Sequence, residues 1–186
     1  LDSAGLPSMR RPQGECGVGN AVMPAFDVVV ATQDWHPPDH GSFAANQPGT
    51  TPGQVIDLHG LPQVLWPVHC VQGTAGAALH PGLDQHRLAA VFQKGTDPRV
   101  DSYSGFFDNG RRGDTGLTAW LRARGVREVT VLGLATDYCV KFTALDAVEQ
   151  GFTTRLVAAG CRAVDLQPGD GARALAELAA AGVAIV

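Results

Sequence analysis

The chain has 186 residues, of which 45% are hydrophobic and 17% are charged. This balance excludes a disordered chain, and the length fits one domain with a buried core. The 14 basic and 18 acidic residues give a formal net charge of -4, which argues against a nucleic-acid binder. No apolar run is long enough to span a membrane and no signal peptide is visible, so we expect a cytoplasmic protein without a membrane partner.

The predicted elements alternate between strand and helix from residue 25 onward. Residues 26–32 (FDVVVAT) and 88–93 (LAAVFQ) are apolar runs typical of strands that are buried on both faces. Residues 37–87, between these two strands, are rich in Pro, Gly and Gln and lack clear periodicity, so we interpret them as a long functional loop. Residues 114–124 then carry apolar side chains at helical spacing, and Gly125 follows as a stop signal.

The same alternation continues to the end of the chain. Residues 127–135 (REVTVLGLA) form the clearest predicted strand, and residues 139–150 form the helix after it. A further strand over 153–159, a helix over 169–181 and a short strand over 183–186 complete the pattern. Alternation of this kind predicts an α/β fold of three layers, with helices on both faces of a mainly parallel sheet.

Reactive side chains follow several of the predicted strands. Asp34 and His36 follow the first, Lys94 the second, Cys139 the third and Cys161 the fourth. In open parallel sheets ligands bind beyond the carboxyl ends of the strands, which meet at one edge. We therefore expect a nucleophile, a cation and metal ligands to converge at this edge.

Cys139 is the candidate nucleophile. It opens a predicted helix directly after a strand and a tight turn (GLATDYC), and the free N–H groups of a helix start stabilise negative charge. We therefore expect a lowered pKa for the Cys139 thiol and backbone N–H groups that could hold an oxyanion. Lys94 could stabilise the thiolate or hold an acidic partner, although a surface lysine at a strand end fits its position equally well.

Asp34, His36 and His69 offer one carboxylate and two imidazoles. This ligand set suits a catalytic or substrate-orienting Zn²⁺, Mn²⁺ or Fe²⁺ ion, and His40 is a candidate fourth ligand. The alternative is that these are loop histidines which only form hydrogen bonds.

Four stretches of the sequence together resemble a known family. ATQDWHPPDHGSFA, WPVHCVQGTAGAALHPGL, VFQKGTDPRVDSYSGFFDNGRR and VLGLATDYCVKFTALDA are similar, in order and spacing, to the nicotinamidase/pyrazinamidase family of isochorismatase-like cysteine hydrolases. The resemblance implies an isochorismatase-like (Rossmann-like) hydrolase domain over residues 25–186, preceded by an atypical segment over residues 1–24. It also implies hydrolysis of nicotinamide, and of pyrazinamide, in NAD salvage and pyridine nucleotide biosynthesis.

The resemblance implies roles for individual catalytic residues. Cys139 becomes the nucleophile and Lys94 the lysine of a catalytic triad. Ala135 follows a cis peptide bond from Leu134, and the backbone N–H groups of Ala135 and Cys139 form the oxyanion hole.

The implied binding residues fall into two sets. The first holds a divalent metal ion (Zn, Mn or Fe) that orients the pyridine ring: Asp34, His36 and His69, with His40 as a less certain addition. The second lines the ring pocket: Trp66, Tyr103, Tyr138 and Leu134. The implied partner is a small-molecule amide, and self-association into a homo-oligomer is left open.

One element of the family pattern is not found in the sequence. The pattern begins with an apolar strand that ends in an aspartate, in a motif resembling VDxQNDF, and this aspartate is the general acid/base. Residues 1–24 have no β-branched run, and their carboxylates, Asp2 and Glu15, end no strand. The N-terminal central strand is therefore expected to be absent or altered. Either the first 24 residues do not represent the natural protein, or a stretch near the N-terminus is missing, or the chain has lost this carboxylate.

The leading hypothesis is therefore a metal-dependent cysteine amidase that acts on nicotinamide. The alternatives are another isochorismatase-like amidase and a catalytically impaired pseudoenzyme that binds a metal and a ring ligand. A redox module that uses Cys139 and Cys161 is poorly supported, because their spacing shows no redox motif.

Overall fold

Parallel strands form the centre of the fold in the computed structural model, which describes residues 13–186. The strands are β1 (Val30–Asp34), β2 (Val55–Leu58), β3 (Leu61–Val64), β4 (Ala90–Lys94), β5 (Glu128–Leu134), β6 (Thr153–Arg162) and β7 (Ala184–Ile185). β1 pairs with β4 in parallel, β5, β6 and β7 form a second parallel group, and β2 and β3 form an antiparallel hairpin. The predicted α/β class with mainly parallel strands is confirmed.

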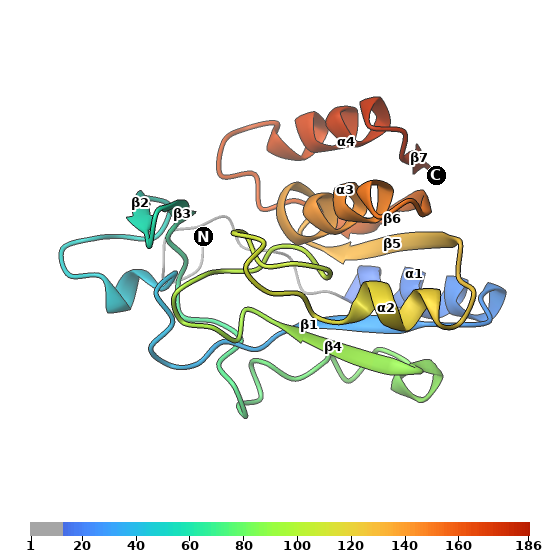
Figure 1. Ribbon diagram of the computed structural model, residues 1–186, viewed down its shortest axis with the longest axis horizontal. Helices are drawn as coiled ribbons and strands as arrows, with labels where there is room; N and C mark the ends of the chain where they lie inside the picture. The colour runs from blue at the N-terminus through green and yellow to red at the C-terminus, as the bar shows by residue number, and fades with distance from the viewer. Residues whose placement is uncertain (1–12) are drawn as a thin grey trace.

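Helices lie on both sides of these strands. The helical elements are α1 (Gln13–Val22), η1 (Met23–Ala25), η2 (Ala44–Asn46), η3 (Gln85–Arg87), α2 (Leu117–Arg122), the π-helical turn η4 (Thr136–Val140), α3 (Lys141–Glu149) and α4 (Asp170–Ala180). Both α1 and α3 contact β5 and β6, and α4 contacts β7. In Figure 1 the paler α1 lies farther from the viewer than α2, and the arrowheads of β4 and β5 point toward the side of the β2–β3 hairpin.

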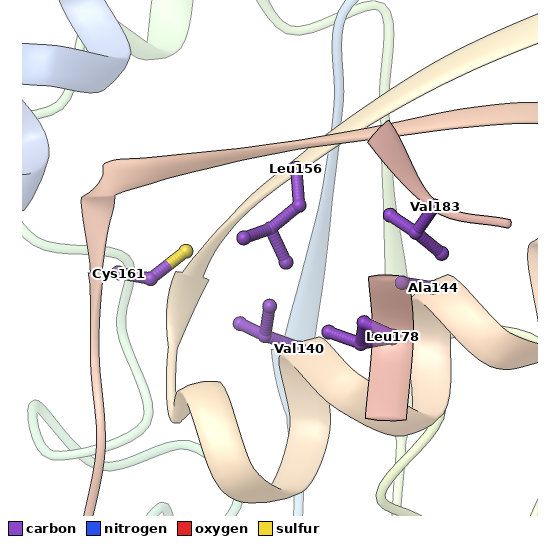
Figure 2. Packing of buried hydrophobic residues seen from close by; sticks show 6 residues of the cluster. All are labelled: Val140, Ala144, Leu156, Cys161, Leu178 and Val183. Carbon is purple, nitrogen blue, oxygen red and sulfur yellow. The ribbon is translucent and has the colours of Figure 1, made fainter. Parts of the chain in front are cut away.

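A cluster of buried side chains joins α3 and α4 to β6. Its members are Val140, Ala144, Leu156, Cys161, Leu178 and Val183. Figure 2 shows the Leu156 side chain pointing toward Val140 and Leu178, with the sulfur of Cys161 at the edge of the same cluster. The expectation that Cys161 follows a strand at the ligand edge is therefore wrong, because Cys161 lies within β6 and packs in the core.

Several element boundaries differ from the predicted ones. The first strand begins at Val30 and ends at Asp34, because its hydrogen-bonded register with β4 covers these residues and sets Asp34 opposite Lys94. β6 continues through a bulge as far as Arg162, beyond its predicted end at residue 159. The helix predicted from residue 139 begins at Lys141, because Thr136–Val140 form the π-helical turn η4.

The segment predicted as a long loop contains the β2–β3 hairpin. His59 and Gly60 connect its strands, and both have positive φ angles, of 52° and 87°. Two positive φ angles are the mark of a tight two-residue hairpin turn, for which Asn-Gly and Asp-Gly are the usual sequence signals. The dipeptide His-Gly is a weaker hairpin signal than Asn-Gly or Asp-Gly, and for this reason the sequence does not predict the hairpin.

An apolar cavity of about 460 Å³ lies between β1 and β5, and its lining includes Val30, Val131, Leu134 and Cys139. Within residues 13–186, no strand pairs with the facing edges of β1 and β5. This is the position at which a central strand is expected.

The described part of the N-terminal segment is helical. Residues 13–25 form α1 and η1, and Glu15 in α1 is buried and lies 3.1 Å from Arg162. Asp2 lies outside the described residues. In the part of the chain that the structure describes, no helix is both long and apolar enough to cross a bilayer.

Leu156→Ala should lower the free energy of unfolding by about 2–5 kcal/mol, because it leaves a cavity in a fully buried position. Val55→Ala is the control: Val55 is 62% exposed on β2, and its loss should cost about 0.5 kcal/mol or less. Urea unfolding followed by circular dichroism measures both changes. Equal losses in the two variants would contradict this description of the core.

Candidate active site

Lys94 is the buried cation at the centre of the site. Lys94 is the last residue of β4, and its side chain is turned inward, so that the residue is only 4% exposed. The ammonium Nζ donates hydrogen bonds to Asp34 Oδ1 and, at 2.7 Å, to the carbonyl oxygen of Ser102. The same atom lies 3.4 Å from Cys139 Sγ. The structure therefore brings together three residues that the sequence places 60 and 45 positions apart.

The charges of Lys94 and Asp34 stabilise each other. Burial alone would lower the pKa of Lys94, but the charges of Asp34 and Cys139 outweigh it, and the pKa is raised. Burial would raise the pKa of Asp34, but the adjacent ammonium outweighs it, and the pKa is lowered. Lys94 and Asp34 are therefore an ion pair at neutral pH.

Cys139 lies in the turn η4, between β5 and α3. Burial raises the pKa of its thiol to about 11, although the charge of Lys94 acts in the opposite direction. The expected lowering of this pKa is therefore wrong for the chain as the structure shows it. A helix start and a nearby lysine both lower the pKa of a thiol, but the desolvation of the sulfur, which depends on tertiary packing, outweighs them here.

The turn before Cys139 has a distinctive backbone. The Leu134–Ala135 peptide bond is cis, as the family resemblance implies. The carbonyl oxygen of Ala135 accepts hydrogen bonds from the N–H groups of Tyr138, at 3.1 Å, and Val140, at 3.0 Å. These two bonds hold the backbone on either side of Cys139.

Three of the predicted metal ligands lie beside the ion pair. Asp34, His36 and His69 each offer one ligand atom, and these atoms lie within 4.8 Å of one another. His36 Nδ1 donates to the carbonyl oxygen of Gly95, and His69 Nδ1 donates to that of Pro67, both at 2.8 Å. Because a carbonyl only accepts, both Nδ1 atoms carry the proton and both Nε2 atoms keep a lone pair for a metal. The donor set therefore fits a divalent ion such as Zn²⁺, Mn²⁺ or Fe²⁺.

His40 is adjacent to His36 in this group of ligands. Its ring centroid is 4.4 Å from that of His36, and the residue is fully buried. His40 Nδ1 bonds to Ser42 Oγ at 2.7 Å, whereas the buried Nε2 has no hydrogen-bond partner among the described residues. Burial lowers the pKa of His36 to about 4 and also lowers the pKa of His40, so both imidazoles are neutral at pH 7.

Asp101 is a buried carboxylate that the sequence did not predict as a site residue. One of its oxygens, His36 and His40 form a second group of ligand atoms within 4.8 Å of one another. An aspartate in a polar loop matches no spacing pattern, so the sequence carried no signal that would single it out.

The predicted aromatic residues Trp66, Tyr103 and Tyr138 lie next to one another and form an aromatic wall. The ring centroid of Trp66 lies 4.7 Å from that of Tyr138 and 6.3 Å from that of Tyr103, and the two tyrosine centroids are 5.3 Å apart. The three rings meet edge to face, and Trp66 Nε1 donates to the Tyr103 hydroxyl at 3.2 Å. Leu134 is placed differently: together with Cys139, it lines the apolar cavity between β1 and β5.

The chain is similar to known proteins in both sequence and fold. The model of the isochorismatase domain family matches residues 29–186. A nicotinamidase of Escherichia coli is 55% identical over 159 residues, which are 86% of this chain and 74% of that protein. The structure of an Acinetobacter baumanii nicotinamidase/pyrazinamidase has a TM-score of 0.90 at 42% identity and covers 94% of this chain and 84% of its own. A Pyrococcus horikoshii pyrazinamidase in complex with zinc has a TM-score of 0.74 at 33% identity, over 94% of this chain and 86% of its own.

Gly95→Ala should weaken zinc binding by roughly tenfold or more, as expected when a ligand loses its orientation. A Cβ atom at Gly95 would lie 2.3 Å from His36 Cε1, so the ring would have to turn away. Gly116→Ala is the matched control, because Gly116 also has a positive φ, of 82°, but has no heavy atom within 4 Å of the new Cβ. It should cost about 1 kcal/mol of stability and leave zinc affinity unchanged.

A competition titration against a chromophoric chelator measures zinc affinity in both glycine variants. Wild-type affinity in Gly95→Ala would show that His36 does not bind the metal from the position described.

Proposed function

This chain belongs to the isochorismatase domain family, and we propose that it hydrolyses nicotinamide to nicotinic acid and ammonia with Cys139 as the nucleophile. The observation that carries this proposal is the 3.4 Å contact between Lys94 Nζ and Cys139 Sγ, beside a three-residue metal-ligand cluster. The 55% identical nicotinamidase supports the substrate, and the similar nicotinamidase/pyrazinamidase supports pyrazinamide as a second one. The reaction belongs to NAD salvage.

The first half of the reaction transfers the acyl group to sulfur. The Cys139 thiolate forms a C–S bond with the amide carbon, and the carbonyl oxygen takes the negative charge. We assign the backbone N–H groups of Ala135 and Cys139 as donors to this oxyanion. The proton that leaves the Cys139 thiol as the C–S bond forms passes to the amide nitrogen, the C–N bond then breaks, and the nitrogen leaves as ammonia with this proton. The product is a nicotinoyl thioester on Cys139.

The second half returns the enzyme to its starting state. Water attacks the thioester carbon, the C–S bond breaks, and nicotinic acid leaves while the sulfur regains its proton. Because its pKa is raised, Lys94 keeps its charge throughout and acts by stabilising negative charge on the sulfur, not by giving up a proton.

Aromatic residues and metal ligands share the binding of the ring. Trp66, Tyr103 and Tyr138 offer edge-to-face contacts to a pyridine ring. The cofactor is a divalent metal ion, for which Asp34, His36 and His69 are the proposed ligands, supported by the zinc complex of the similar pyrazinamidase. When bound, the ion supplies positive charge at the ring nitrogen and fixes the orientation of the ring.

The alternatives are less well supported. A pseudoenzyme or another amidase of the superfamily would have to resemble nicotinamidases over most of the chain without sharing their reaction. The hydrolase domain is assigned to residues 25–186, which the family match over residues 29–186 supports. A cytoplasmic location is supported by four free cysteines, which are typical of a reducing compartment.

Cys139→Ala should reduce ammonia release from nicotinamide to the background rate, because no other group replaces the thiolate. Cys161→Ala is the matched control: it removes a buried thiol from the core and should keep the wild-type rate within about threefold. A coupled ammonia assay measures both variants. Substantial turnover by Cys139→Ala would exclude the proposed role of this cysteine.

Removal of the metal with a chelator should raise KM for nicotinamide by roughly tenfold, the equivalent of about 1.4 kcal/mol of lost binding. It should lower kcat much less, because the bond-making step depends on Cys139 and Lys94. Steady-state kinetics before chelation, after chelation and after zinc is restored separate the two constants. A fall in kcat at constant KM would contradict the orienting role of the metal.

A further inference from the structure

We propose that Asp101 is a positioning residue that joins the metal ligands to the aromatic wall of the ring pocket. The proposal rests on the proposed function, since it assigns a role within that site. It adds a carboxylate that lies outside the ligand group of Asp34, His36 and His69 and outside the aromatic wall.

The Asp101 carboxylate is buried and has only neutral hydrogen-bond donors. The residue is 3% exposed, Oδ1 accepts the N–H of Ser102 at 2.8 Å, and Oδ2 accepts Gln63 Nε2 at 3.0 Å. None of the ion pairs among residues 13–186 includes Asp101. A buried negative charge is costly unless a positive charge is near. The charge of Asp101 does act on Lys94, but Lys94 is already paired with Asp34, so a further positive charge beside Asp101 would stabilise it.

The metal side of the site offers this partner. Ligand atoms of Asp101, His36 and His40 lie within 4.8 Å of one another, and His36 also belongs to the group with Asp34 and His69. The charge of Asp34 is already paired with Lys94. Asp101 is therefore the second negative charge available to a divalent ion held beside His36.

The ring side of the site depends on the same carboxylate through Gln63. Gln63 is 2% exposed, and its Nε2 lies 3.0 Å from Asp101 Oδ2 and 3.1 Å from the Tyr103 hydroxyl. The same Nε2 also donates to the carbonyl oxygen of Val64 at 2.7 Å. Because a carboxylate and a carbonyl oxygen only accept, Asp101 and Val64 together fix the Gln63 amide with its NH₂ group toward the Tyr103 hydroxyl. Tyr103 also accepts from Trp66 Nε1, so this one amide holds two rings of the aromatic wall.

Asp101 is also linked to the nucleophile side. It accepts from the N–H of Ser102, and the carbonyl oxygen of Ser102 accepts from Lys94 Nζ at 2.7 Å. The charge of Asp101 acts to raise the pKa of Lys94 and of Tyr103, as expected for an anion that lies close to both parts of the site.

Asp101→Asn is the direct test, because it keeps the size of the side chain and removes its charge. Zinc affinity should fall by roughly tenfold to a hundredfold, the loss typical of removing a group that supports a metal site. KM for nicotinamide should rise roughly tenfold, while kcat in saturating zinc stays within about threefold of wild type. Asp97→Asn is the matched control: the Asp97 side chain is 39% exposed and pairs with Arg99 at 2.7 Å, so its replacement should change none of the three values.

Gln63→Leu separates the two links and serves if Asp101→Asn does not fold. It cuts the connection to the aromatic wall and leaves the carboxylate in place, so KM should rise while zinc affinity stays unchanged. Unchanged KM in Gln63→Leu, or zinc affinity and KM both within twofold of wild type in Asp101→Asn, would overturn the proposal. Zinc affinity can be measured without turnover, so the two proposals can fail separately. If Asp101→Asn loses zinc affinity while the wild type releases no ammonia from nicotinamide, the role of Asp101 is supported and the proposed function is refuted.

Discussion

The site depends on one buried ammonium group. Lys94 is almost entirely removed from water, and an unpaired charge in such a place costs several kcal/mol. The parallel register of β1 and β4 offsets this cost by setting Asp34 opposite Lys94 at the carboxyl ends of the two strands. The turn after β5 then brings Cys139 within 3.4 Å of the same ammonium. Loss of either charged partner would leave the other buried without compensation.

Asp34 couples the two halves of the site. One of its oxygens accepts from Lys94, and the residue also belongs to the ligand group with His36 and His69. Lys94, which contacts the Cys139 sulfur, and the group of metal ligands therefore share one carboxylate, which links the position of the sulfur to that of the ligand group. Backbone carbonyls at Gly95 and Pro67 hold the two imidazoles in the orientation that the ion requires.

The sequence predicts those parts of the structure that depend on local pattern and on strand direction. β5 and α4 match their predicted ranges within one residue, and Asp34, Lys94 and Cys139 converge because the carboxyl ends of parallel strands meet. The pKa of Cys139 and the core position of Cys161 depend on tertiary burial, which the local sequence does not encode.

The remaining differences have similar physical origins. The β2–β3 hairpin has a His59-Gly60 turn, and this dipeptide is a weak sequence signal for a hairpin. Asp101 comes near His36 and His40 only when segments distant in the sequence fold together. Within residues 13–186, no strand pairs with the edges of β1 and β5 that border the apolar cavity.

The central claim is that the ammonium of Lys94 stabilises negative charge on the sulfur of Cys139. Iodoacetamide alkylation of Cys139, followed by mass spectrometry of its peptide, measures this in the wild type and in Lys94→Met. We predict that alkylation slows roughly tenfold for each unit by which the pKa of the thiol rises in the variant, while Cys16 in the same samples keeps its rate. Equal rates at Cys139 in both proteins would contradict the account.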